Sequence, residues 1–257
     1  MIFQCIRFGT MNAALCAIAS SSSAEEKLSN AHLPRRCLLS AMDGPDPRRT
    51  PARFRFAARE RAQIMPVILE TARLYLRSLA AGDLKRFHKL HEDPFVVNAV
   101  YDGKAPSFAD TCDRFKKSLA DWDVRGYGPF VVFARDGSCG EGRFLGQRGL
   151  GFLADSDDLE LSAYFHQAAS GNEYAPEAGC AILNFAFTIL GAPRVLCFVR
   201  PENRRSLRSV GKMGFRQIDD RWFGDRLRHC FEVTQQDLKG AVAANPRFTP
   251  MPVRSCL

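Results

Sequence analysis

The spacing of apolar residues changes at about residue 65, beyond which it follows the periods of secondary structure. Over residues 69–79, apolar side chains nearly alternate with polar ones, which predicts a half-buried β-strand. Behind Asp83, apolar residues recur every third position over residues 84–90, and behind Ser107 a similar spacing runs over residues 108–122. Both stretches predict amphipathic helices, because each follows a side chain that can cap a helix N-terminus.

The middle of the chain predicts a hairpin, a strand, a helix and a second strand. Apolar runs over residues 130–133 and 144–146 flank a turn rich in Gly, Asp and Ser, as in a β-hairpin. Residues 160–166 predict a strand, and residues 176–189 predict a helix with apolar positions at helical spacing. The apolar, β-branched run at residues 194–199 predicts a strand that is covered on both faces.

A short helix is predicted next, beginning at Asn203 and ending at Gly214, because its apolar residues share one face and glycine ends helices readily. Residues 215–218 and 229–233 predict the last strands. Strands that alternate with helices in this way indicate an α/β fold with a mixed sheet. After Lys239, three prolines predict a loose tail.

Residues 1–64 differ in kind from the rest of the chain. They contain a serine run, several prolines, and ten Lys or Arg residues against five Asp or Glu. Such a segment buries too little apolar surface to offset the entropy of ordering it. We therefore expect a flexible extension, translated from a start upstream of an authentic one at Met65. Residues 65–239 are predicted to form one domain, and residues 240–257 the loose tail.

Composition narrows the class of protein. The net charge is +8, of which +5 falls in residues 1–64, so the folded part is only mildly basic and nucleic-acid binding is disfavoured. No apolar run approaches the ~18 residues of a membrane span. The nine cysteines form no Cys-x-x-Cys pair and no cluster with zinc-ligand spacing. This usage argues against a structural metal and for a reducing compartment, the cytoplasm.

The stretch with the most chemical content runs from the strand at residues 160–166 through a small-residue loop into a helix. The loop holds Ser170, Gly171 and Asn172, and Pro176 suits the first turn because its missing N–H would have no partner there. Such a turn directs several backbone N–H groups and the helix dipole at one point, which favours a phosphate-type anion. Alone, this signal is general, since every strand–loop–helix unit has it.

Two motifs together make the signal specific. The first is Ser-Gly-Asn-Glu-Tyr-Ala-Pro-Glu-Ala at residues 170–178; the second is Pro-Glu-Asn at 201–203, then Ser206, then Lys-Met-Gly-Phe at 212–215. In order and spacing they resemble the GNAT superfamily of N-acetyltransferases. The most similar branch contains the N-terminal acetyltransferases of ribosomal proteins. The resemblance covers about residues 69–233, which is a whole domain.

The resemblance implies a fold and a co-substrate. The fold would be a single GNAT-like domain with a mixed, mostly antiparallel sheet flanked by helices. Its two central parallel strands, here residues 160–166 and 194–199, would splay apart and hold acetyl-CoA between them. The residues implied to bind acetyl-CoA are Phe165 and His166 along the pantetheine, Gly171, Asn172, Glu173, Tyr174 and Ala175 at the pyrophosphate, and Asn203 on the far side of the pantetheine.

The resemblance also implies two catalytic residues. Glu160 would take the proton of the amine, directly or through water, or would hold the ammonium; a free α-amine has a pKa of ~8, so a modest base suffices. Backbone N–H groups near residues 164–166 would stabilise the oxyanion. Ser206 would protonate the leaving thiolate, because Val210 stands where many superfamily members have a tyrosine.

Each assignment has a structural alternative. Glu160 can bond to a neighbour within the sheet, Ser206 can serve only in packing or capping, and Asn203 can be a plain helix N-cap. His166 lies among aromatic residues, where packing is the commoner role. Glu173 departs from the family, which has a glycine there. Its Cβ costs about 1 kcal/mol of strain if the carboxylate points to solvent, and a carboxylate pointing inward would oppose the pyrophosphate.

Two functions are open on the sequence. One is acetyl transfer from acetyl-CoA to a primary amine, on a protein N-terminus or a small molecule, by direct attack through a tetrahedral intermediate. The other, motivated by Glu173, is a catalytically impaired acyl-CoA-binding or regulatory protein. The loops expected to select the acceptor, residues 100–107 and 121–130, carry no motif. The oligomeric state is open as well, a homodimer included.

Overall fold

The computed structural model describes residues 66–135, 141–153, 156 and 158–255. Within these residues, nine strands form one sheet in the order β7-β8-β6-β5-β4-β3-β2-β1-β9, in which only the β5–β6 pair is parallel. The predicted α/β fold with a mixed, mostly antiparallel sheet is confirmed. The extension predicted for residues 1–64 lies outside the described residues.

The strands are β1 (Val67–Glu70), β2 (Leu74–Ser78), β3 (Pro129–Ala134), β4 (Phe144–Phe152), β5 (Leu159–Phe165), β6 (Val195–Val199), β7 (Arg216–Phe223), β8 (Arg226–Val233) and β9 (Arg254–Ser255). The α-helices are α3 (Leu84–Glu92), α4 (Pro94–Val100), α5 (Phe108–Arg125), α6 (Tyr174–Thr188), α7 (Arg204–Lys212) and α8 (Gln235–Ala244). Three 3-10 turns join them: η4 (Ala81–Asp83), η5 (Gln167–Ala169) and η6 (Pro246–Phe248).

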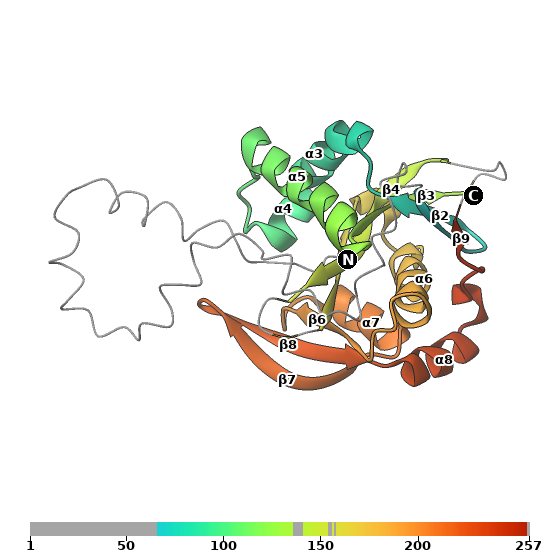
Figure 1. The fold of residues 1–257 in the computed structure, drawn as a ribbon. Helices are drawn as coiled ribbons and strands as arrows, with labels where there is room; N and C mark the ends of the chain where they lie inside the picture. The colour runs from blue at the N-terminus through green and yellow to red at the C-terminus, as the bar shows by residue number, and fades with distance from the viewer. Residues whose placement is uncertain (1–65, 136–140, 154–155, 157, 256–257) are drawn as a thin grey trace, which may run out of the picture. The chain divides into compact units, whose positions relative to one another are not determined.

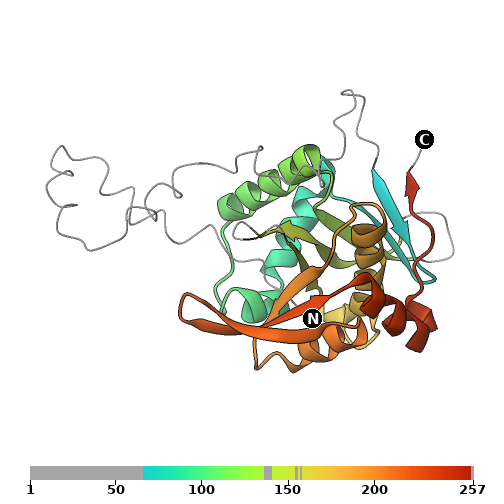
Figure 2. The ribbon, with the colours of Figure 1, turned by 60° about the horizontal axis from the view of Figure 1, so that its bottom comes forward.

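Helices cover both faces of the sheet (Figure 1, Figure 2). On one face, Tyr164 of β5 packs with buried apolar residues of α3 and α4. On the opposite face, Arg148 of β4 reaches α6 and the end of α7, since it donates to the carbonyl of Ala175 at 2.7 Å and lies 3.3 Å from Sδ of Met213. Helix α5 packs across α3, and α8 packs against α6. The central strands are therefore enclosed.

The middle of the sheet is the most deeply buried part of the described chain. Every residue of β5 and of β6 is buried, which confirms the strand predicted to be covered on both faces. Helix α6 is buried nearly all round. The helix predicted over residues 176–189 ends one residue earlier, at Thr188, and Ile189, the last apolar position of the predicted helix, is 43% exposed.

The single strand predicted over residues 69–79 is two strands. β1 and β2 pair antiparallel with Leu69 opposite Leu76, and the turn between them is closed by Thr71, whose N–H donates to the carbonyl of Leu74. Thr71 Oγ1 also donates to Glu177 of α6 at 2.5 Å. The predicted alternation was correct, but the prediction of one continuous strand was wrong. The buried carboxylate of Glu177 on α6 fixes a turn that cannot be seen in the apolar pattern.

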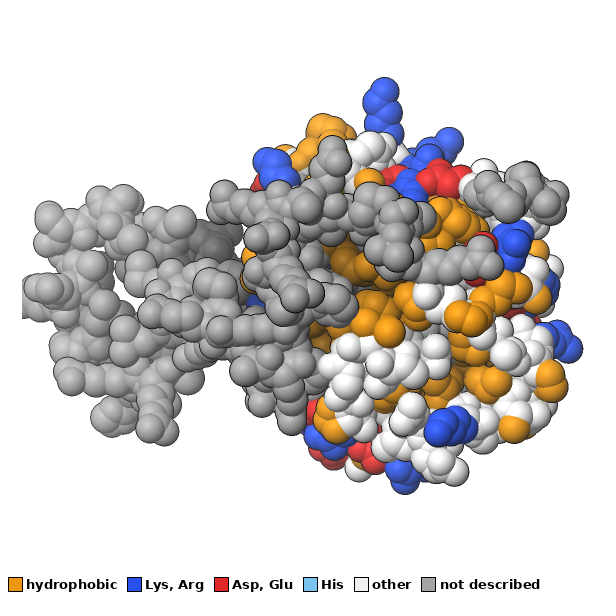
Figure 3. Space-filling model, turned by 45° about the vertical axis from the view of Figure 1, so that its right-hand side comes forward, with side chains coloured by type: hydrophobic (Ala, Val, Ile, Leu, Met, Phe, Trp, Pro, Cys, Tyr) orange, Lys and Arg blue, Asp and Glu red, His pale blue; other side chains and the backbone are white. Residues whose placement is uncertain are grey.

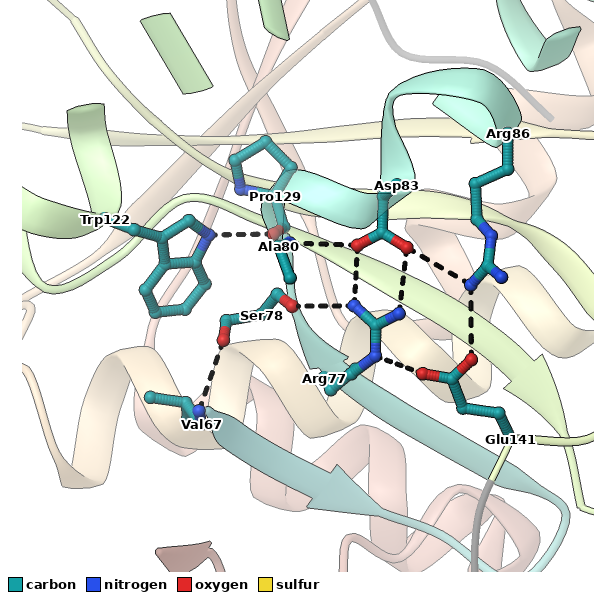
Figure 4. A network of polar contacts seen from close by, with 9 residues as sticks. All are labelled: Val67, Arg77, Ser78, Ala80, Asp83, Arg86, Trp122, Pro129 and Glu141. Atoms are coloured by element: carbon teal, nitrogen blue, oxygen red, sulfur yellow. Dashed lines mark hydrogen bonds and ion pairs between the residues drawn. The ribbon is translucent and has the colours of Figure 1, made fainter. Parts of the chain in front are cut away.

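The helix expected behind Asp83 is present as α3, but Asp83 does not cap it. Its carboxylate instead accepts from Arg77 Nη1 and Nη2 at 2.6 and 2.8 Å, and from the N–H of Ala80 at 2.9 Å (Figure 4). The bidentate guanidinium on β2 competes successfully with the helix N-terminus, since charge-assisted pairs are the stronger bonds.

Helix α4 was not predicted, whereas α5 was. α4 begins behind Asp93, whose side chain accepts from the N–H of Phe95, and proline occupies its first position. α5 begins at the predicted cap: Ser107 and Asp110 form a reciprocal capping box. It ends at Gly126, whose φ of 71° lies in the left-handed region that glycine favours.

The segment after Lys239 was predicted to be loose and is instead regular structure. Helix α8 continues to Ala244, η6 follows, and β9 pairs with β1 at the far edge of the sheet. The reason is apolar burial: Phe248 is fully buried in the main core. Prolines mark where regular structure stops, but they do not show whether the side chains between them pack.

Candidate active site

The parallel strands β5 and β6 are paired only where they begin. Leu159 lies opposite Val195 and Glu160 opposite Leu196, and no pairing follows, although β5 continues to Phe165 and β6 to Val199. The strands therefore diverge beyond Glu160. Backbone N–H and C=O groups along their facing edges point into the opening between them and do not pair with the other strand. The central splayed pair that the sequence predicted is confirmed.

The end of β5 presents Phe165, rather than His166, to this opening. The N–H of His166 donates to the carbonyl of Leu145 on β4, and its carbonyl accepts from the N–H of Ala169. Successive N–H groups of a strand point to opposite edges, so the N–H of Phe165 faces the β6 side. The His166 ring is engaged as well, with Nδ1 2.6 Å from Oδ2 of Asp93.

The loop between β5 and α6 has the form of an anion site. It runs through η5 to Gly171 (φ 85°) and Glu173 (φ 61°), and α6 begins at Tyr174, two residues before Pro176. Two left-handed residues so close together bring consecutive N–H groups to one side of the loop. Ser170 Oγ is buried and has no hydrogen-bond partner among the described residues, so its hydroxyl fits a ligand oxygen here. The loop residues Gly171, Asn172, Glu173, Tyr174 and Ala175 thus stand together at the helix N-terminus.

Glu173 points its carboxylate at two cations. Lys212 donates to Oε1, and Arg247 Nη1 lies 2.6 Å from Oε2. The hydrogen bond from Lys212, together with the positive charges of Lys212, Arg247 and Arg73, holds the pKa of Glu173 below its usual range. An ionised carboxylate therefore neutralises cations at the edge of the loop where an anionic ligand would bind.

Arg148 places a positive charge beneath the first turn of α6. Its side chain is fully buried and donates to the carbonyl of Ala175. Burial lowers its pKa to about 10, while the neighbouring thiols Cys197 and Cys180 act in the opposite sense, so the guanidinium is charged at neutral pH. Sequence reasoning did not select Arg148. The signal was there, since it is the one charged residue inside the apolar strand β4.

Glu160 is buried at the point where the strands separate. It is 4% exposed and shares one face of β5 with Ser162 and Tyr164, because side chains alternate along a strand. The charge of Glu160 favours the ionised form of the buried Arg228 on β8. The carboxylate therefore faces the side of the sheet covered by α3 and α4, opposite to α6.

The start of α7 lies just after the end of β6. Asn203 is its N-cap, with Oδ1 accepting from the N–H of Ser206 at 3.1 Å. Ser206 is fully buried, and so is Val210 one turn later. The capping role of Asn203, one of its two readings in the sequence, is present in the structure, and it fixes where Ser206 lies relative to β6.

Comparisons with known proteins agree with this geometry. A family model described as an acetyltransferase (GNAT) domain matches residues 73–216. The chain therefore belongs to the GNAT acetyltransferase family. The uncharacterized protein YkkB of Bacillus subtilis (strain 168) is 30% identical over 152 residues, which cover 57% of this chain and 83% of that protein.

Solved structures share the fold. The crystal structure of an acetyltransferase from Agrobacterium tumefaciens strain C58 is 25% identical, with a TM-score of 0.58, and covers 69% of this chain and 99% of its own. Mycobacterium smegmatis RimJ in complex with CoA-disulfide is 18% identical, with a TM-score of 0.53, and covers 71% of this chain and 93% of its own. At 18% identity the second likeness shows the fold alone.

The described residues offer no metal site and no membrane span. None of their His, Cys, Asp and Glu side chains gather in threes at metal-binding distance, and no helix among them has the length and apolarity to cross a membrane. On the face in Figure 3, visible Lys and Arg side chains are spread around the periphery, with apolar side chains between them. The divergence of β5 from β6, with the loop before α6, therefore remains the candidate active site.

Proposed function

We propose that this protein transfers the acetyl group of acetyl-CoA to a primary amine. The observation that carries the proposal is the divergence of β5 from β6 after Glu160, which opens onto the loop and first turn of α6. The left-handed Gly171, the Ser170 hydroxyl and the charge of Arg148 all favour a diphosphate at that turn. Asn203, at the start of α7, would bound the pantetheine from the β6 side.

The residues divide the chemistry between them. Glu160 takes the proton of the amine or holds the ammonium, because an amine of pKa ~8 needs only a modest base. The N–H of Phe165, directed at the opening, stabilises the oxyanion of the tetrahedral intermediate. Ser206 protonates the leaving thiolate. His166 positions the end of β5 through Asp93 rather than acting in the reaction.

The finer assignments belong to the same proposal. The acceptor is a primary amine, either on a protein N-terminus, as in the ribosomal-protein branch of the family that the motifs resemble, or on a small molecule. The location that cysteine usage predicted, the cytoplasm, is part of the proposal too.

The test measures binding and turnover separately. Calorimetry with acetyl-CoA is expected to show binding by the wild-type chain, and release of free thiol with a panel of amines is expected to show transfer. Glu160→Gln should leave acetyl-CoA affinity within about twofold and lower kcat/KM by about 10²–10⁴. Glu92→Gln, an exposed Glu to Gln change on α3, serves as the matched control. Absence of acetyl-CoA binding would refute the proposal.

A second function is favoured by one observation, the ionised Glu173 at the pyrophosphate loop. In that case the chain is an acyl-CoA-binding or regulatory protein that does not catalyse acetyl transfer. Tight binding of acetyl-CoA together with no thiol release across the amine panel would select this function over the first.

A further inference from the structure

A second feature lies beside the cleft, where β6 ends. A pocket of about 340 Å³ is lined by Asp102, Arg200, Pro201, Glu202, Arg226 and Leu227. These residues come from the turn after α4, the segment between β6 and α7, and the start of β8. We call it the Arg200–Arg226 pocket. Its volume lies at the low end of small-molecule sites, which suits a compact ligand.

The pocket is organised by two guanidinium groups that share one carboxylate. Arg200 Nη2 lies 3.0 Å from Oδ1 of Asp102, and Arg226 Nη1 contacts the other oxygen. Although burial alone would raise the pKa of Asp102, the hydrogen bond from Arg226 and the charges of both guanidinium groups hold it below its usual range. The bridge is therefore ionised and brings the two guanidinium groups together.

Hydrogen-bond donors outnumber acceptors in this bridge. Two guanidinium groups carry ten N–H donors, whereas one carboxylate offers about four lone-pair sites. Nε of Arg200 is buried and has no hydrogen-bond partner among the described residues. The Arg200 side chain is only 15% exposed, so it is largely withdrawn from water. An oxyanion with two oxygens suits a pair of guanidinium groups, because guanidinium groups bind carboxylates in a bidentate manner.

The surrounding charges favour an anion as well. The buried Arg228 stands two residues after Arg226 on the same face of β8, and the positive charges of Arg200 and Arg226 each disfavour its ionised form. Two acidic residues act in the opposite sense. Buried Glu160 favours the ionised form of Arg228, and exposed Glu202 favours the ionised form of Arg226. Two arginines thus line one small pocket with Asp102 between them, and the charge of a third, Arg228, acts on both.

The pocket adjoins the reaction centre of the proposed function. Arg200 directly follows Val199, the last residue of the splayed strand β6, and Glu202 directly precedes Asn203. Glu160, the residue proposed to accept the proton of the amine, lies opposite Leu196 of β6, four residues before Arg200, and its charge acts on Arg228. A ligand that places an oxyanion on Arg200 and Arg226 can therefore direct its other end toward the cleft.

We propose that the acceptor is a small amine that also carries a carboxylate, such as an amino acid, and that Arg200 and Arg226 bind this carboxylate. The proposal rests on the acetyl-transfer function for the role of the amine, but not for the binding of the carboxylate. Glu202 opposes the carboxylate electrostatically and sets an upper limit on the affinity.

The test compares amines that differ only in this charge. Amino acids and their carboxamides are offered in matched pairs to the full chain with saturating acetyl-CoA, and thiol release is followed. The acid of at least one pair is expected to show a KM at least tenfold below that of its amide. Arg226→Gln should raise the KM of the acid at least tenfold and change that of the amide less than twofold.

Two further variants sharpen the test. Glu202→Gln should lower the KM of the acid about threefold, a change in the opposite direction. Arg216→Gln is the matched control, because it removes the same charge from the same hairpin. Arg216 pairs with Glu232, which lies six residues, about 20 Å, along β8 from Arg226. It should change neither KM. Arg226→Lys, which keeps the charge but loses the planar fork, should give an intermediate value.

Binding is measured independently of turnover, by calorimetric titration of the same acids and amides into the wild-type chain and Arg226→Gln. Acids that bind with the expected preference but are not acetylated would refute acetyl transfer and support the pocket. Acetylation that prefers amides, diamines or peptide amides would overturn the pocket assignment and leave acetyl transfer intact. Equal binding of acid and amide to the wild-type chain would also overturn it.

Discussion

Arg247 of η6 places its Nη1 atom 2.6 Å from Oε2 of Glu173, in the loop that precedes α6. The family match ends at residue 216, so this contact joins the loop to a segment outside the matched region. Lys212 holds the other oxygen of the same carboxylate. The C-terminal segment therefore takes part in the electrostatics of the proposed pyrophosphate site, in addition to burying Phe248.

Glu173→Gln is expected to raise the affinity for acetyl-CoA about tenfold, equivalent to about 1.4 kcal/mol. The substitution removes an anion beside the expected diphosphate and leaves Lys212 and Arg247 available to it. Calorimetry at two salt concentrations measures the change, which should shrink at high salt because exposed charges are screened.

Arg247→Gln should lower the affinity under the same conditions, because it leaves the negative charge of Glu173 less compensated. Glu92→Gln, which makes the same change on α3 away from the loop, should have no effect. If Glu173→Gln left the affinity unchanged, the carboxylate would not act on the bound co-substrate.

The stability of the fold is expected to fall below pH 6.5 because of His91. Burial, together with the charges of Arg114 and His88, lowers the pKa of His91 to about 3. The unfolded chain takes up a proton at its ordinary pKa of 6.5 and the folded chain does not, so acid favours unfolding. The contribution is fully present above pH 6.5 and is lost by about 1.4 kcal/mol per pH unit toward pH 3.

Urea unfolding at pH 7 and pH 4.5 measures this effect, and His91→Phe should reduce the difference between the two by about 2–3 kcal/mol. Tyr101→Phe is the control, because it removes the 2.6 Å hydrogen bond to Nδ1 of His91 but keeps the imidazole. It should lower stability at both pH values alike. An unchanged pH dependence in His91→Phe would show that other groups cause the acid sensitivity.

Gly179→Ala is expected to destabilise the chain by about 1–3 kcal/mol. A Cβ there would lie 2.3 Å from Sδ of Met213 and 2.9 Å from Cζ of Arg148, so the buried guanidinium must move. Gly240→Ala in α8 is the matched control, since its Cβ meets nothing within 4 Å. It should stabilise by about 0.5–1 kcal/mol, and chemical denaturation measures both. Stabilisation by both would mean that Arg148 tolerates displacement.

Asp83→Ala is expected to cost about 3 kcal/mol of unfolding free energy, because it leaves Arg77 buried with one of its partners removed. The carboxylate is 2% exposed and the Arg77 side chain 14%, whereas Arg86 and Glu141 in the same network are each 36% exposed (Figure 4). Arg86→Ala should therefore cost less than about 1 kcal/mol. Similar losses in the two variants would contradict the ranking by burial.

Much of the fold was predictable because its signals are local. The cap at Ser107, the stop at Gly214 and the apolar run of β6 each depend on neighbours within a few residues, and each is present. The divergence of β5 from β6 followed from the resemblance carried by the two motifs. What failed depended on distant partners: Arg77 draws Asp83 away from its helix, and Glu177 fixes the turn between β1 and β2.

The candidate site divides in the same way. The loop with Gly171 and Glu173, and the capping Asn203, were selected by residue type at fixed spacing. Arg148, Arg247 and the Arg200–Arg226 pocket were not, because their partners are separated from them by tens of residues along the chain.

The sequence by itself determined the order of the elements, the family motifs and the position of the loop proposed to bind an anion, since periodicity, capping and glycine conformation are properties of short segments. Only the tertiary structure decided which charges meet: the carboxylate of Glu173 with Arg247, and that of Asp102 with Arg200 and Arg226. Electrostatic energy depends on the distance between charges in space, and for residues far apart in the sequence that distance is set only when the chain folds.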